Sequence, residues 1–149
     1  MTSAGDAPGA LGARLGHAFR DRGLLDQALT HSSYANEHPP AVGNDGLAFL
    51  GDAVLALVVA EHRWRAAPGA SVGALTTERA ELVSGANLAR WAEVLGLGAH
   101  VRLGRGEQLT GGHAKESVLA TALEAVLGVV YLEAGLPGAR QAVAALAMW

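Results

Sequence analysis

The chain has 149 residues, of which half are hydrophobic and 17% are charged, and its formal net charge is −3. This length suits one domain with a sizeable core, and the slight negative charge argues against strong non-specific binding of nucleic acid by the chain as a whole. Since there is no cysteine, disulfides and thiolate metal sites are excluded. Acidic residues interrupt the longest apolar runs, so neither a signal peptide nor a membrane span is expected, and a cytoplasmic protein is the default.

Apolar residues recur at helical spacing along almost the whole chain, and glycine or proline separates the helices that they predict. Residues 1–8 are small and polar and are expected to be frayed. The predicted helices run, in chain order, over residues 11–19, 24–29 and onward towards 37, 44–65, 71–83, 88–95, 115–135 and 137–146. No segment alternates as a strand does. The prediction is therefore one all-α domain over residues 9–149, a bundle of about seven helices.

Two other features invite a functional interpretation and also have a simpler one. The polar, glycine-rich stretch 104–113 can bring its backbone close to a phosphate, but it is expected to be a long connecting loop. His31, His62 and His113 each suggest a catalytic histidine. We expect each to be a hydrogen-bonded structural residue, because the sequence places no complete nucleophilic constellation around them.

Two acids lie within helices that are otherwise apolar. Asp52 belongs to the helix that begins at Asn44, with Asn44 as the expected N-cap and Asp45 in the first turn. This helix is apolar almost all round, so it is expected to be buried. Glu124 lies in the later helix that begins near residue 115. An unpaired carboxylate inside such a helix costs roughly several kcal/mol, so each acid has either a structural partner or a catalytic or metal-binding role.

If the two helices pack side by side, the carboxylates of Asp52 and Glu124 converge on one cation, share a proton or accept hydrogen bonds. Residue chemistry alone leaves these alternatives open.

Eight ordered segments carry recognisable motifs. They are residues 29–37, 44–55, 95–98, 103–107, 111–112, 115–120, 124–128 and 131–135. In this order they resemble the nuclease domain of the ribonuclease III family over nearly the whole chain. The resemblance implies an all-helical domain that dimerises and handles double-stranded RNA. It also implies that Phe49 inserts into a pocket on the partner subunit, with ordinary core packing within one chain as the alternative.

The chemistry of this family requires four carboxylates, two from each of two helices, which hold Mg²⁺ ions that activate water and stabilise the leaving oxygen of an RNA phosphodiester. Pairs three or four residues apart serve because they project from one helix face. The resemblance assigns two of these positions to Asp52 and Glu124. The other two are Ala48 and Thr121, which carry no charge.

The missing charges affect the expected cofactor directly. Two doubly charged ions about 4 Å apart repel by about 4 kcal/mol in water, and by roughly 16 kcal/mol at an effective dielectric constant near 20. Two carboxylates leave half of the ionic charge uncompensated. A single Mg²⁺ could still bind weakly, because this ion keeps most of its waters, so magnesium is expected to be weakly bound or absent.

The RNA-binding residues are harder to assign. Bacterial ribonuclease III proteins of the common type carry a separate double-stranded RNA-binding domain, and none is expected in this chain. Arg102, Arg105 and Lys115 are the candidates to line an RNA groove in a dimer, with a solvated surface as the alternative.

The sequence therefore predicts a pseudo-nuclease, a ribonuclease III-like domain that binds or helps to process double-stranded RNA in RNA maturation or assembly. Its expected partners are RNA and a second copy, or a complete ribonuclease III chain in a heterodimer, with no membrane. Two alternatives stay open. One is an active Mg²⁺-dependent endoribonuclease that uses Asp52 and Glu124, and the other is a structural dimer that binds no RNA.

Overall fold

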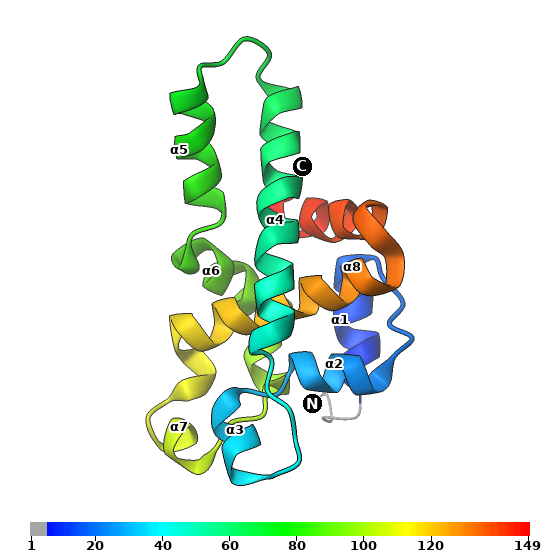
Figure 1. The fold of residues 1–149 in the computed structure, drawn as a ribbon, viewed down its shortest axis with the longest axis vertical. Helices are drawn as coiled ribbons and strands as arrows, with labels where there is room; N and C mark the ends of the chain where they lie inside the picture. Colours follow the sequence, from blue (N-terminus) through cyan, green and yellow to red (C-terminus); the bar gives the residue numbers. More distant parts are fainter. Residues whose placement is uncertain (1–5) are drawn as a thin grey trace.

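The computed structural model describes residues 6–149, and its regular elements are helices (Figure 1). The α-helices are α1 (Ala7–Leu15), α2 (Arg22–Ala28), α3 (Ser32–Glu37), α4 (Asp45–Ala66), α5 (Val72–Leu82), α6 (Gly85–Leu95), α7 (Arg105–Leu109) and α8 (Glu116–Ala147), and the 3₁₀ helices are η2 (Leu97–His100) and η3 (Gly112–Ala114). Among the described residues the one β-type pairing is an isolated bridge between Thr30 and Arg102. The predicted all-α fold is confirmed.

The helices differ in detail from the predicted set. The glycine-rich stretch 104–113, for which the sequence predicts a loop, contains α7 and most of η3. Helices of one turn or so are too short for apolar periodicity to reveal them. The short segment before α4 likewise forms a separate helix, α3, after the bridge at Thr30.

The N-terminal connection also differs from the prediction. Helix α1 ends at Leu15, because Gly16 adopts a left-handed conformation with φ 66°. Phe19, which the sequence places in this helix, lies in the connection to α2 and packs edge-on against His17, with ring centroids 4.8 Å apart. Of the residues predicted to be frayed, 1–5 lie outside the described part of the chain, whereas residues 7–8 belong to the first turn of α1.

Glu133 on α8 holds this connection in place through hydrogen bonds. Its side chain is 7% exposed and accepts hydrogen bonds from His17 Nε2 (2.8 Å) and from the backbone N–H groups of Arg20 (3.0 Å) and Asp21 (2.8 Å). Burial alone would raise the pKa of Glu133, but the bonds from Asp21, Arg20 and His17 outweigh it and lower the pKa. The N-terminal helices are therefore tied to the core by an ionised carboxylate.

Helices α4 and α8 cross at the centre of the molecule, with their backbones in direct contact (Figure 1). A Cβ atom added to Gly51 on α4 would lie 1.7 Å from the carbonyl oxygen of Glu124, and one added to Gly128 on α8 would lie 2.6 Å from that of Leu47. No side chain fits at either place. The two glycines let the helices approach until residues that flank them lie side by side.

Helix α8 is the core helix of the domain. It contacts α4 and α6 along its first part, and it breaks at Gly135 (φ 65°, ψ −165°), just before Pro137. This break separates the last two predicted helices, as the glycine and proline indicated. By length and composition α8 is the one described helix that could cross a membrane, but 61% of its most apolar stretch is already buried in this domain.

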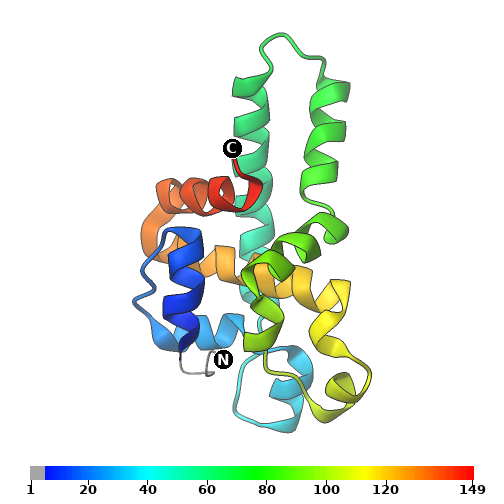
Figure 2. The same ribbon diagram turned by 180° about the vertical axis from the view of Figure 1, so that it is seen from behind.

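The end of α4 and the whole of α5 form a hairpin that projects beyond α8, as both views show (Figures 1 and 2). The prediction that α4 is buried is wrong for this part. The side chains of Leu57 and Trp64 are 52% and 69% exposed, and α5 contains no buried residue. An apolar pattern indicates that a face avoids water, but it does not say whether the same chain or another one covers it.

Candidate active site and exposed apolar face

The helix crossing brings Asp52 and Glu124 together. Asp52 directly follows Gly51, whose backbone lies against the carbonyl group of Glu124, and the two carboxyl groups are within hydrogen-bonding reach. Burial raises the pKa of Glu124 to about 7, and Asp52 adds to the rise through the hydrogen bond and its negative charge. The pair therefore shares a proton near neutral pH. The convergence that the sequence left open is present in the structure.

The two positions without charge lie beside this pair. Ala48 is 8% exposed and sits one turn before Asp52 on α4, and Thr121 is half-buried one turn before Glu124 on α8. Asp45 remains in the first turn of α4, as predicted. In the described part of the chain, no three His, Asp or Glu side chains are grouped so as to hold a metal ion. At this crossing, Asp52 and Glu124 are therefore the carboxylates available to a cation.

Asn44 begins α4 as predicted, but its side chain does not cap the helix. Instead its Nδ2 donates a hydrogen bond to the carbonyl oxygen of Ala28, at 3.0 Å, and the residue is 1% exposed. The amide group thus joins the end of α2 to the start of α4. The N-cap preference located the helix start correctly, while the tertiary contact decided the use of the side chain.

The three candidate RNA-binding cations lie at the end of the molecule that holds α2, α3 and α7. Lys115 Nζ pairs with Glu107 at 2.9 Å, and Arg102 lies 3.6 Å from a carboxylate oxygen of Asp26. Arg105 is exposed at the start of α7. Two of the three charges are thus partly neutralised within the chain.

The three histidines have structural contacts. His31 Nδ1 accepts a hydrogen bond from the backbone N–H of Ser33 at 3.2 Å and so caps α3. His113 Nε2 donates to the carbonyl oxygen of Val101 at 3.2 Å. His62 stacks on Trp149, with ring centroids 3.7 Å apart, so its contact is aromatic.

A continuous apolar face runs along α4 and onto α5, and sequence reasoning identified only one of its members. Phe49 is 82% exposed, so it does not pack into the core of its own chain. Leu57 and Trp64 follow eight and fifteen residues later, which places them close to Phe49 around the helix. Val72 on α5 is 81% exposed. The regular spacing of Phe49, Leu57 and Trp64 is the signal that could have revealed the face.

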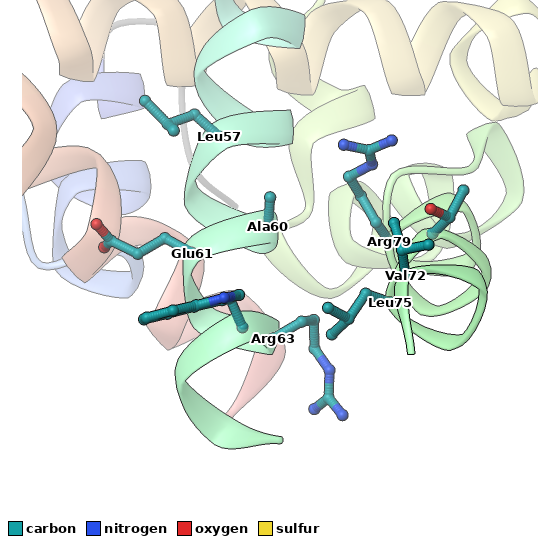
Figure 3. A pocket seen from close by; sticks show the side chains of 9 residues that line it. Leu57, Ala60, Glu61, Arg63, Val72, Leu75 and Arg79 are labelled. Carbon is teal, nitrogen blue, oxygen red and sulfur yellow. The ribbon is translucent and has the colours of Figure 1, made fainter. Parts of the chain in front are cut away.

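Between α4 and α5 this face contains a groove of about 370 Å³ (Figure 3). Its apolar lining is formed by Leu57, Ala60, Trp64, Val72 and Leu75. Charged side chains, including those of Arg63 and Arg79, lie around it. The chain therefore exposes both a protruding aromatic ring and an apolar groove large enough to receive one.

Residues 21–148 match the Ribonuclease-III-like family. The chain belongs to this family. It is 49% identical to Ribonuclease 3 of Symbiobacterium thermophilum over 85% of this chain and 54% of that protein, and 46% identical to Ribonuclease 3 of Heliobacterium modesticaldum over 95% and 61%. The chain thus spans little more than half the length of these curated relatives.

The fold agrees with solved ribonuclease III nuclease domains. The structure of the nuclease domain of ribonuclease III from Campylobacter jejuni superposes with a TM-score of 0.85 at 38% identity, covering 92% of this chain and 93% of that one. That structure is described as flexible in the region involved in dimer formation. The resemblance to the ribonuclease III nuclease domain is confirmed.

Proposed function

We propose that this ribonuclease III-like domain is a catalytically impaired pseudo-nuclease that binds double-stranded RNA and takes part in RNA maturation or assembly in the cytoplasm. The observation that carries the proposal is the acid pair itself. Where the family's chemistry uses four carboxylates, this crossing offers Asp52 and Glu124 beside Ala48 and Thr121, and burial keeps one of the two acids partly protonated near neutral pH. Such a site has too little negative charge for two divalent ions.

Asp52 and Glu124 would hold a single Mg²⁺, which when bound supplies a Lewis acid for a phosphate oxygen. The contribution of the chain is to hold the exposed carboxyl group of Asp52 beside the half-buried one of Glu124. Protonation of Glu124 competes with metal binding, because a ligand carboxylate must be ionised. Magnesium affinity should therefore decrease as the pH falls below 7, where Glu124 becomes protonated.

The apolar face supports a dimer of two copies of this chain. An isolated helix as short as α5 is marginal in water, and α5 has no buried residue to stabilise it. Phe49 and the groove form a self-complementary pair, since each copy offers both, and such a pair closes an isologous two-fold dimer. The Campylobacter relative has a region involved in dimer formation, which supports a second copy of this chain as the molecule that covers the face.

RNA would meet this dimer through Arg102, Arg105 and Lys115, of which Arg105 is the most available. Phosphate contacts of this kind weaken as salt rises. Binding of a double-stranded RNA at low salt, lost at high salt, is the expected result in a gel-shift titration. No binding at low salt would favour the structural dimer without RNA binding.

Cleavage of double-stranded RNA with Mg²⁺ or Mn²⁺ tests the impairment. The matched control is Ala48→Glu with Thr121→Asp, which restores four acids at the same crossing. We expect cleavage by the restored variant and none above background by the natural chain. A natural-chain rate within about tenfold of the restored variant would contradict the proposal. If Asp52→Asn then abolished that cleavage, the domain would be an active endoribonuclease that uses the remaining acids.

A further inference from the structure

Arg79 is a cation without an ion-pair partner in the described part of its own chain. It lies on α5 and lines the groove, and Figure 3 shows its guanidinium turned towards the Leu57 end of the groove. Its neighbour Arg63 donates to Glu78 at 2.7 Å, whereas Arg79 forms no ion pair or side-chain hydrogen bond with any residue from 6 to 149. The position therefore offers an unpaired charge on a face that a second copy would cover.

Asp52 lies on the same side of α4 as this arginine. Asp52 and Arg63 are eleven residues apart, which is about three helical turns, so both point from one side of α4. Arg63 contacts Glu78 of α5, which makes this the α5 side. Within one chain, however, Asp52 lies about 7.5 Å from Leu57 along the axis of α4, towards the start of the helix and beyond the end of the groove.

The two-fold dimer removes this separation. If Phe49 of one copy enters the groove of the other at the level of Ala60, the two α4 helices run antiparallel about a common axis. In this antiparallel register, residue 49 of one α4 is level with residue 60 of the other. Asp52, which is three residues closer to the two-fold axis than Phe49, is therefore level with Leu57 of the other copy. When the two-fold axis is perpendicular to the plane that contains the two antiparallel helices, equivalent side chains of the two copies stay on the same side of that plane. Asp52 of one copy and Arg79 of the other therefore meet.

We propose that Arg79 of each protomer reaches Asp52 of the partner subunit, so that each acid pair belongs to a composite site built from both chains. This inference rests on the proposed dimer. A guanidinium is always charged, and its planar donors match a carboxylate or a phosphodiester oxygen pair. At a crossing that lacks two acids, Arg79 holds the carboxylate of Asp52 in place and offers its remaining donors to an RNA phosphodiester. It is a positioning residue for Asp52.

Because the chain has no cysteine, thiol cross-linking can test this contact without background. An Asp52→Cys, Arg79→Cys variant is treated with a short bis-maleimide, since the side chains of an ion pair set their Cβ atoms too far apart for a disulfide. The control is Asp52→Cys with Glu81→Cys, because residue 81 lies about 200° around α5 from residue 79. We expect covalent dimers to form at least about tenfold faster for the first variant.

Sedimentation of the uncross-linked protein separates the possible failures. A dimer that cross-links no faster than the control, or a link that forms within one chain, overturns the composite site but leaves the dimer. A protein that stays monomeric at high concentration overturns the proposed dimer, and the composite site with it.

A double-mutant cycle supplies a second measurement. Arg79→Gln should raise the dimer dissociation constant about fivefold, and it should have little effect when Asp52→Asn is already present. Arg65→Gln, at the end of α4, is the matched charge control. Equal effects of Arg79→Gln in both backgrounds would show that the two side chains do not interact, and would overturn the proposal.

Discussion

Helix α4 takes part in two regions that differ in what covers their apolar side chains. At its first half, Gly51 and Gly128 let the backbones of α4 and α8 touch, and the side chains of Leu47, Ala48 and Val54 are buried there. Its second half forms a hairpin with α5 that carries exposed Leu57, Trp64 and Val72, although Glu61 still bonds Arg140 of α8. The first region stabilises one chain, and the second has apolar surface that only another molecule can cover. One continuous apolar helix thus serves both the fold and the proposed assembly.

The largest expected effect is at the crossing. Gly51→Ala places a Cβ atom where the carbonyl oxygen of Glu124 lies, so the helices must separate. We expect the free energy of unfolding to fall by roughly 3 kcal/mol or more, as urea denaturation would measure. Gly46→Ala on the same helix is the control, because an added Cβ meets nothing there. Equal behaviour of the two variants would show that the helices do not touch as described.

Substitution on the exposed apolar face should respond in the opposite way. Phe49→Ala removes an exposed ring, so the stability of a monomer should hardly change, while the dimer dissociation constant should rise about thirtyfold. Analytical ultracentrifugation measures this directly. Val94→Ala is a suitable control, since Val94 is 64% exposed on α6, away from the groove. If both substitutions weakened the dimer equally, the apolar face would not be the interface.

Breaking the link between α8 and the N-terminal helices should lower the free energy of unfolding by less than Gly51→Ala does. Glu133→Gln leaves the donors of Arg20 and Asp21 without an ionised acceptor, and we expect a loss of about 2 kcal/mol in the free energy of unfolding at pH 7. Because folding lowers the pKa of Glu133, its contribution is complete above the ordinary value of 4.5 and is lost as the pH falls through the lowered value. Thermal melts of the variant should therefore be less sensitive to acid than those of the natural chain.

The acid pair predicts a pH dependence of opposite sign. Folding raises the pKa of Glu124 to about 7, so the folded state binds this proton more tightly than the unfolded chain does. Its contribution is complete below 4.5 and is lost as the pH rises to about 7. The Tm of the natural chain should therefore decline over this window relative to that of Glu124→Gln. Parallel melting curves for the two proteins would contradict the shared proton.

Much of the fold could be predicted because its signals are local. Helical periodicity located the long helices, Asn44 marked the start of α4, and Gly135 with Pro137 marked the break in α8. Asp52 and Glu124 could be singled out as lone acids in apolar helices, and the structure brings them together. Short helices such as α7 escaped, since one turn carries too little periodicity to be recognised.

The order of residues alone indicated an all-helical domain, two lone acids in apolar helices, and no thiol. Which of these groups meet follows from the packing of the helices. Gly51 and Gly128 bring Asp52 beside Glu124, and the packing leaves Phe49 near the start of α4 and Trp64 in the projecting hairpin outside the core. The reason is physical, because burial and pKa depend on atoms distant in the chain, whereas a sequence pattern reports only a preference for leaving water.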